Sequence, residues 1–203
     1  MFLVNSEIIN PQHPTAAQQS QLLGLACAAI RYGIINHTVM PLNTTAYETA
    51  LQEPLATFVT LKKNGQLRGC IGTLKAQRPL IEDVVYNAWQ AAAHDPRFDP
   101  VQADELQHLH ISISILSPPQ AFPVVSEKDL ISKLRPGEDG LIIEDGYHRA
   151  TFLPSVWQQL PEPIDFIHHL KLKAGLPANQ WSGSIKVQRY TSFEFGADFI
   201  DLT

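Results

Sequence analysis

Residues 55–74, LATFVTLKKNGQLRGCIGTL, carry the strongest local signal in the chain. Two runs rich in β-branched and aromatic residues flank Asn64-Gly65, a dipeptide preferred in the type I′ turn of a β-hairpin. The stretch therefore predicts two antiparallel strands. An unbroken register, counted outward from the turn, predicts these cross-strand pairs: Lys63 with Gln66, Leu61 with Arg68, Thr60 with Gly69, and Val59 with Cys70.

Two glycines flank the cysteine of the second predicted strand. Glycine in a strand interior gives up packing and conformational entropy, so Gly69 and Gly72 indicate a bulge or a place where a ligand or another backbone comes close. Strict alternation predicts that Arg68, Cys70 and Gly72 share one face, together with Val59 and Leu61. In this register Gly72 leaves space beside the thiol and Gly69 clears the opposite face. The segment is then either an irregular piece of core or the wall of a site.

The rest of the chain alternates helical and strand patterns. Apolar spacing predicts helices, a strand and a second hairpin, followed by one closing strand. The helices are expected at 15–34, 79–93 and 163–174, the strand at 109–119, the second hairpin around Asp145-Gly146, and the closing strand at 184–196. This order predicts an α+β fold, an antiparallel β-sheet with flanking helices.

Composition narrows the class of protein. A chain of 203 residues with 44% hydrophobic and 17% charged residues predicts one folded globular unit rather than disorder. The formal charge is −5 and basic residues are scattered, so nucleic acid is not expected as a partner. No apolar run resembles a signal peptide or a membrane span, which predicts a cytoplasmic protein without a membrane partner. Two cysteines form no disulfide framework and are expected to be reduced thiols.

Cys70 is the leading candidate for chemistry. Arg68 lies two residues away on the same predicted face, and a nearby cation favours the nucleophilic thiolate. The alternative is that Cys70 is a small buried hydrophobic residue, because free cysteine is among the most buried residue types.

Four histidines are weaker candidates. His94, next to an aspartate, or His148 on the second hairpin could act as a base for the thiol. His108 and His110 fall on one predicted strand face and could chelate a metal. Surface or capping roles, and the polar face of a half-solvated strand, explain the same pattern.

The segment DPRFDP, residues 95–100, is a second candidate. Asp95 can bond to its own backbone two residues on and fix a turn. Arg97 can pair with a carboxylate for structural reasons, or it can clamp an acidic ligand through two parallel hydrogen bonds.

Taken together, these motifs resemble those of the AMMECR family, known in bacteria and archaea as AmmeMemoRadiSam system protein A. The resemblance covers nearly the whole chain from about Gln18, and its most specific parts are LRGCIG and DPRF in that order. The matching stretches are LRGCIGTL at 67–74, AAAHDPRFDP at 91–100, ISILSPP at 113–119, GEDGLIIEDGYHRATFLPSVW at 137–157, FIHHLKLKAGLPANQW at 166–181 and KVQRYTSFEF at 186–195.

The resemblance implies a single AMMECR domain over residues 1–203, split into a larger and a smaller lobe with a cleft near the LRGCIG hairpin. It also implies a Memo-like protein and a radical SAM protein as partners. His94 stands where the family varies, and His108 and His110 are not part of its pattern.

The resemblance and the local chemistry lead to one functional expectation and one alternative. The chain is expected to be an enzyme, or the substrate-binding component of one, with Cys70 and Arg68 catalytic and no cofactor or metal. Its predicted substrate-binding residues are Gly69, Gly72, Asp95 and Arg97. The alternative is a non-enzymatic adaptor in which Cys70 is structural.

Overall fold

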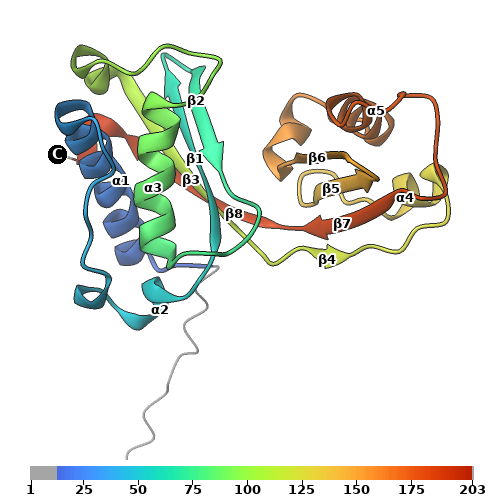
Figure 1. The fold of residues 1–203 in the computed structure, drawn as a ribbon, viewed down its shortest axis with the longest axis horizontal. Coiled ribbons are helices and arrows are strands. Elements are labelled where there is room, and N and C mark those ends of the chain that lie inside the picture. Colours follow the sequence, from blue (N-terminus) through green and yellow to red (C-terminus); the bar gives the residue numbers. More distant parts are fainter. Residues whose placement is uncertain (1–12, 203) are drawn as a thin grey trace, which may run out of the picture. The chain divides into compact units, whose positions relative to one another are not determined.

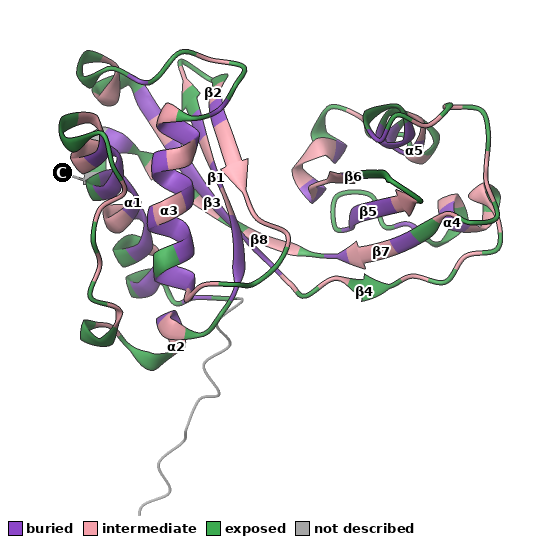
Figure 2. Ribbon diagram, in the orientation of Figure 1, coloured by how far each residue is buried: buried purple, intermediate pink, exposed green. Residues whose placement is uncertain are grey.

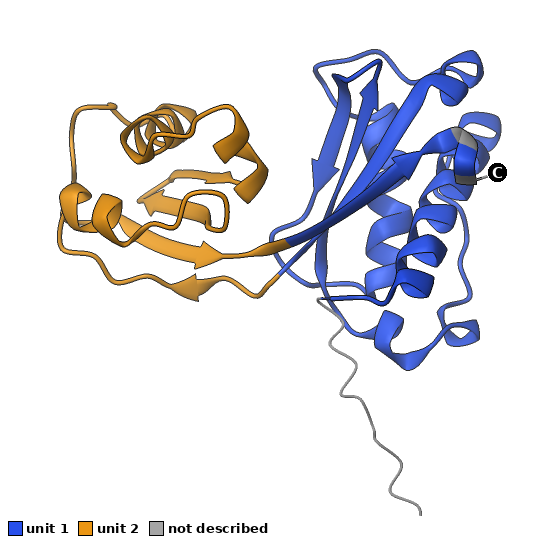
Figure 3. Ribbon diagram, turned by 180° about the vertical axis from the view of Figure 1, so that it is seen from behind, with its two compact units in different colours: residues 1–116, 193–203 blue, residues 117–192 orange. Residues whose placement is uncertain are grey.

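The computed structural model describes residues 13–202 and contains two four-stranded antiparallel sheets. The chain divides into two compact units, one within residues 1–116 and 193–203, the other within 117–192 (Figure 3). The second unit is therefore an insertion between two strands of the first. The predicted α+β class is confirmed, although the sequence did not indicate the boundaries of the units.

Unit 1 combines helices with a sheet whose strand order is β2-β1-β3-β8 (Figure 1). A capping box begins its first helix, because Thr15 and Gln18 exchange side-chain-to-backbone hydrogen bonds. Its elements are α1 (Ala16–Asn36), η1 (Thr44–Ala46), α2 (Thr49–Gln52), β1 (Ala56–Lys63), β2 (Gln66–Gly72), α3 (Leu80–Ala93), η2 (Ala103–His108), β3 (Leu109–Leu116), β8 (Ser192–Asp198) and η4 (Phe199–Leu202).

Helices α1 and α3 cover one face of this sheet, and the core of unit 1 lies between this face and the helices (Figures 1 and 2). The strands alternate apolar and polar residues, so this face carries fully buried aliphatic side chains. They include Val59 and Leu61 of β1 and Ile111 and Ile113 of β3. The opposite face carries residues such as Thr60, Ser112 and Ser114.

The β1–β2 hairpin turns where the sequence predicted, but its register does not run unbroken. Asn64 and Gly65 have φ values of 52° and 79°, as a type I′ turn requires. Lys63 pairs with Gln66 as predicted, and Lys62 pairs with Leu67. The register then shifts, so that Leu61 pairs with Gly69 and Thr60 with Cys70. Arg68 is the extra residue of a β-bulge. The predicted pairings of Leu61 with Arg68, Thr60 with Gly69 and Val59 with Cys70 are therefore wrong, and Cys70 lies on the face opposite to Val59 and Leu61.

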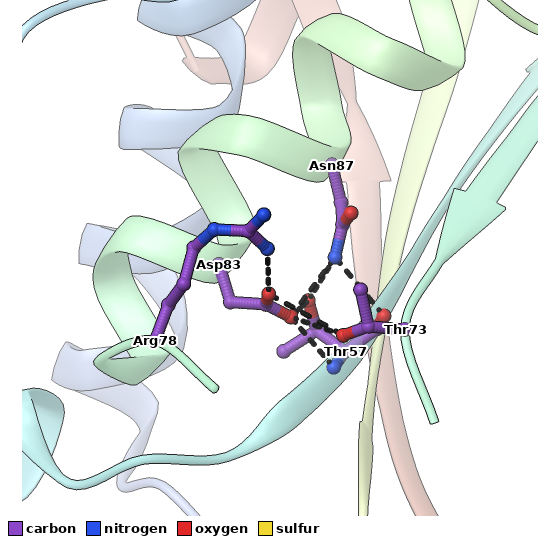
Figure 4. Close-up of polar contacts among 5 residues, drawn as sticks. All are labelled: Thr57, Thr73, Arg78, Asp83 and Asn87. Carbon is purple, nitrogen blue, oxygen red and sulfur yellow. Dashed lines mark hydrogen bonds and ion pairs between the residues drawn. The ribbon is translucent and has the colours of Figure 1, made fainter. Parts of the chain in front are cut away.

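A fully buried carboxylate ties the start of α3 to the sheet (Figure 4). Asp83 Oδ2 accepts hydrogen bonds from the backbone N–H and the hydroxyl of Thr57, at 2.9 and 2.8 Å, and from Asn87 Nδ2 at 2.9 Å. The Thr73 hydroxyl donates to the same oxygen at 3.1 Å, and Arg78 donates to Oδ1 at 3.0 Å. The cluster thereby joins β1, α3 and the segment that follows β2.

Unit 2 packs its helices against a smaller sheet, with strand order β4-β7-β5-β6. Its core is formed by Leu141 and Ile143 of β5 together with Phe166, Ile167 and Leu170 of α5. The elements are β4 (Gln120–Ala121), α4 (Glu127–Lys133), β5 (Gly140–Asp145), β6 (His148–Phe152), η3 (Pro154–Gln158), α5 (Pro163–Lys173) and β7 (Lys186–Tyr190).

The predicted single closing strand is wrong. The chain interrupts it at Thr191, so that β7 belongs to the sheet of unit 2 and β8 to the sheet of unit 1. An apolar-polar pattern does not reveal which sheet a strand joins, and the two runs are separated by one residue. Among the helices of the described residues, none has the length and apolar character needed to cross a membrane.

Replacing Asp83 by Ala should lower the free energy of unfolding by about 3 to 5 kcal/mol, because the donors of Thr57, Asn87 and Arg78 would lose a buried anionic acceptor. Chemical denaturation monitored by circular dichroism measures this loss. Glu82→Gln, an exposed change in the same helical turn, is the control and should cost less than about 1 kcal/mol. Equal effects of the two changes would contradict the anchoring role.

Candidate functional site

Cys70 lies on the face of β2 that points away from α1 and α3, and its side chain is partly exposed. The hydroxyl of Thr60, its cross-strand neighbour, donates to Sγ at 3.2 Å. Cys27 offers a contrast within the same unit. It is 1% exposed, and burial raises the pKa of its thiol to about 12. The two thiols therefore occupy very different environments.

Asp95 caps the outer edge of β2 at the cysteine. Because β2 is an edge strand, the N–H of Cys70 has no neighbouring strand on that side. Asp95 Oδ2 accepts this N–H at 2.8 Å, and Oδ1 accepts the backbone N–H of Arg97 at 3.1 Å. The second bond confirms the predicted turn, while the first was not predicted. The Asp95 side chain is 2% exposed.

Arg97 folds back onto Asp95 in a two-pronged ion pair. Its Nε donates to Oδ1 at 2.9 Å and its NH2 to Oδ2 at 2.6 Å. The same NH2 lies 3.4 Å from the carbonyl oxygen of Cys70. The hydrogen bond from Arg97, followed by those from the backbone, lowers the pKa of Asp95 to about 2. The pair thus satisfies both backbone groups of Cys70 and remains ionised at neutral pH.

Arg68 has a different environment from the predicted one. Its Nε and NH2 hold both oxygens of Glu105, at 3.0 and 2.9 Å, and its NH1 donates to the carbonyl of Asp99 at 2.8 Å. This contact, with a further one from Lys63, lowers the pKa of Glu105 to about 2. The expectation that Arg68 shares a regular strand face with the thiol is wrong, because Arg68 is the bulge residue. Its catalytic role stays a prediction.

The protein itself occupies the space beside both glycines of the motif. A Cβ at Gly69 would collide with the carbonyl oxygen of Ala91 in α3, and one at Gly72 with the ring of Phe58. Gly69 therefore lies on the helix-covered face and lets the C-terminal end of α3 approach the strand. The open space expected at Gly72 is filled, so packing explains both glycines, and substrate binding by them stays a prediction.

The four histidines lie apart from the thiol contacts described above. His94 is the exposed C-cap of α3 and packs edge-on against Trp89, and His148 Nδ1 lies 3.0 Å from the carbonyl of Ala174. His108 ends η2 rather than sharing a strand with His110, whose Nδ1 lies 2.8 Å from Asp198. Within residues 13–202, no three His, Cys, Asp or Glu side chains are grouped to hold a metal ion.

A pocket of about 490 Å³ lies on unit 2 and contains none of the predicted site residues. Its lining is mainly apolar, with Glu144, Lys186 and Gln188 as its polar members. A volume of this size suits a small molecule. Among the described residues, no cysteine, serine, threonine or histidine lines this pocket, so the Cys70 cluster remains the candidate site.

Sequence reasoning missed two residues of this cluster. Thr60 became the neighbour of Cys70 only through the bulge, for which the glycines were the one available signal. Glu105 lies 37 positions after Arg68, and no local pattern connects them.

Comparisons with known proteins agree on one family. The AMMECR1 family model matches residues 23–195. The chain is 38% identical over 149 residues to Protein MJ0810 of Methanocaldococcus jannaschii, covering 71% of this chain and 74% of that protein. A Thermococcus onnurineus protein is 37% identical over 188 residues, covering 88% and 89%. The crystal structure of the uncharacterised protein PH0010 from Pyrococcus horikoshii has a TM-score of 0.83 and 30% identity, covering 91% and 93%.

Replacing Gly69 by Ala should displace the end of α3, because the new methyl group meets a backbone carbonyl that cannot rotate away. We expect a loss of about 1 to 3 kcal/mol in the free energy of unfolding. Alkylation of Cys70 should also change, since Asp95 follows α3 directly. Gly24→Ala, at a helical glycine with open space around it, is the control and should not destabilise the protein.

The two lowered pKa values predict a loss of stability in acid. A carboxylate with a depressed folded-state pKa contributes its full stability above its unfolded pKa, near 4, and loses it as the pH falls toward about 2. Asp95→Asn and Glu105→Gln should each remove about 1 to 2 kcal/mol at pH 7, and the difference from wild type should shrink between pH 4.5 and 2. Urea unfolding across this range tests the prediction, which a pH-independent difference would contradict.

Proposed function

The chain belongs to the AMMECR1 family, and from this premise we propose that Cys70 is the reactive group of an enzyme, or of the substrate-binding component of one. The supporting observation is the hydrogen bond from Thr60 to Sγ on a partly exposed strand face. A donor to sulfur stabilises the thiolate relative to the thiol. A thiolate is the form that attacks an electrophilic carbon or another sulfur.

In this proposal each neighbour of Cys70 has a separate task. Thr60 orients and stabilises the sulfur. Asp95 and Arg97 bind the backbone N–H and carbonyl of Cys70 at the unpaired edge of β2, so that the side chain of Cys70 keeps one position. Arg97 also presents a cation to a substrate, because its side chain is 54% exposed. Arg68 acts indirectly by joining the bulge to Glu105.

The wider setting of the proposal comes from the family resemblance. A Memo-like protein and a radical SAM protein are the proposed partners, and the substrate is proposed to reach the thiol through a cleft lined by Cys70 and Arg68 in a cytoplasmic protein. A nucleophilic thiol suits a carrier or a transferase that receives an activated group from a partner.

An adaptor without catalytic activity is the second candidate. It is favoured by the packing of Gly69 against α3 and of Gly72 against Phe58, and by the complete engagement of the Arg68 guanidinium. In that case the motif builds a stable strand edge for a partner, and the sulfur beside Thr60 has a packing role.

Alkylation by iodoacetamide across pH 5 to 10 distinguishes these two functions. Cys70 should be labelled first and should reach half of its maximal rate at a lower pH than the cysteine of an unstructured peptide, because its thiolate is stabilised. Cys27 is an internal control that should stay unlabelled in the folded protein, since it is buried and its pKa is raised. Peptide mass spectrometry assigns the labelled residue.

Variants complete this experiment. Thr60→Val should lower the rate at pH 7 about threefold to tenfold by removing the donor to sulfur, and Cys70→Ser should abolish labelling. If Cys70 reacts like the cysteine of an unstructured peptide, or if Thr60→Val changes nothing, the thiolate proposal fails. A Cys70→Ser protein that still binds its partners and supports function in cells would establish the adaptor.

A further inference from the structure

We propose that Arg97 makes the Cys70 site selective for substrates with an anionic oxygen group, a carboxylate or a phosphate, next to the atom that the thiol attacks. This inference rests on the proposed thiol function and names its class of substrate. It depends on which parts of the guanidinium are already bound, on the distance to Cys70, and on the charge around the pair.

Asp95 holds the guanidinium of Arg97 in place but does not bind all of its nitrogens. Nε and NH2 donate to Asp95, which fixes the plane of the group, whereas NH1 has no hydrogen-bond partner among the described residues. The side chain is 54% exposed, although its partner is buried. An arginine that is oriented on one side and open on the other matches the planar geometry of carboxylates and phosphates.

The guanidinium of Arg97 lies beside the backbone of Cys70. Its NH2 is 3.4 Å from the carbonyl oxygen of Cys70, and the charge of Cys70 contributes to the raised pKa of Arg97, after the larger effect of Asp95. The guanidinium carbon of Arg97 lies over the ring of Phe98, 5.4 Å from the ring centroid, which is a cation–π contact. The proposal requires that an anion bound to NH1 has its neighbouring atoms within reach of Sγ.

The distribution of charge disfavours anions around the protein as a whole but favours them beside Arg97. The chain carries a formal charge of −5, so it repels anions at long range. The carboxylate of Asp95 is nearly inaccessible to solvent, whereas the guanidinium of Arg97 is exposed to solvent. A small anion approaching this edge of β2 therefore meets the positive member of the pair.

Two alkylating reagents of similar size test the inference on the full chain. Iodoacetate and iodoacetamide both transfer a carbon to sulfur: an S–C bond forms, the C–I bond breaks, iodide leaves, and the thiol proton goes to solvent. They differ in carrying a carboxylate or a neutral amide. The ratio of their rate constants at Cys70 cancels any change in the reactivity of the thiol itself.

We expect the iodoacetate-to-iodoacetamide ratio at Cys70 to exceed that at 2-mercaptoethanol about tenfold at low salt, and to fall with added sodium chloride. Inorganic phosphate should compete with iodoacetate more strongly than chloride does at equal ionic strength. Arg97→Gln should bring the ratio to that of 2-mercaptoethanol, and Arg97→Lys should retain part of the preference. Arg31→Gln on α1, which removes one positive charge on the other side of the sheet, should leave the ratio unchanged.

The outcomes separate this inference from the proposal beneath it. If iodoacetamide labels Cys70 rapidly but iodoacetate shows no preference, the thiol function stands and anion selectivity is overturned. If neither reagent labels Cys70, the thiol function itself fails. Should Arg97→Gln not fold, the salt dependence of the wild-type ratio and the Arg97→Lys variant still decide the question, because equal ratios at all salt concentrations contradict a role for the charge.

Discussion

The site depends on the close approach of α3 to the edge strand β2 at Gly69. Without a side chain at this position, the carbonyl of Ala91 reaches the strand backbone, and the chain that leaves the helix two residues later is delivered to the strand edge. Asp95 can then accept the N–H of Cys70. A glycine buried on the helix-covered face thus determines what lies beside the thiol on the edge. At its other end, the buried carboxylate of Asp83 fixes the same helix to β1, so α3 has little freedom to move along the sheet.

The two arginines of the motifs perform unequal tasks because of their partners' positions. Arg68 donates to both carboxylate oxygens of Glu105 and to a backbone carbonyl, so its charge is neutralised by a structural contact. Arg97 pairs with a carboxylate that is already shared with two backbone N–H groups, and it keeps one nitrogen open. Glu105 is shared as well, with Lys63 and the backbone N–H of Gln102, so the two arginines differ in NH1, which in Arg97 has no hydrogen-bond partner among the described residues. The arginine farther from the cysteine in sequence is consequently the better candidate for contact with a substrate.

Local signals in the sequence predicted the secondary-structure elements well, but they predicted the strand register and the contacts between distant residues poorly. The Asn64-Gly65 turn is determined by its own backbone conformation, which these two residues favour directly. The bulge at Arg68 is different, because one extra residue changes every pairing beyond it. The contact of Asp95 with Cys70 spans 25 positions and exists only once α3 has packed, so the sequence predicted both residues but not their bond. The division of the last strand between two sheets likewise follows from the insertion of unit 2, which no local pattern encodes.

The two cysteines show how far the surroundings, rather than the residue type, decide reactivity. Cys27 lies inside the helix α1, where loss of water outweighs the nearby charge of Arg31 and keeps the thiol neutral. Cys70 lies on a strand edge, where a hydroxyl donates to its sulfur and an ion pair binds its backbone without covering its side chain. A purely structural cysteine gains stability from burial and has no need of such neighbours. Here a buried aspartate is committed to the backbone of a partly exposed thiol, and its arginine remains open to solvent. A buried aspartate that fixes the backbone of Cys70 is better explained if the position of the thiol matters for function than if the thiol only fills space.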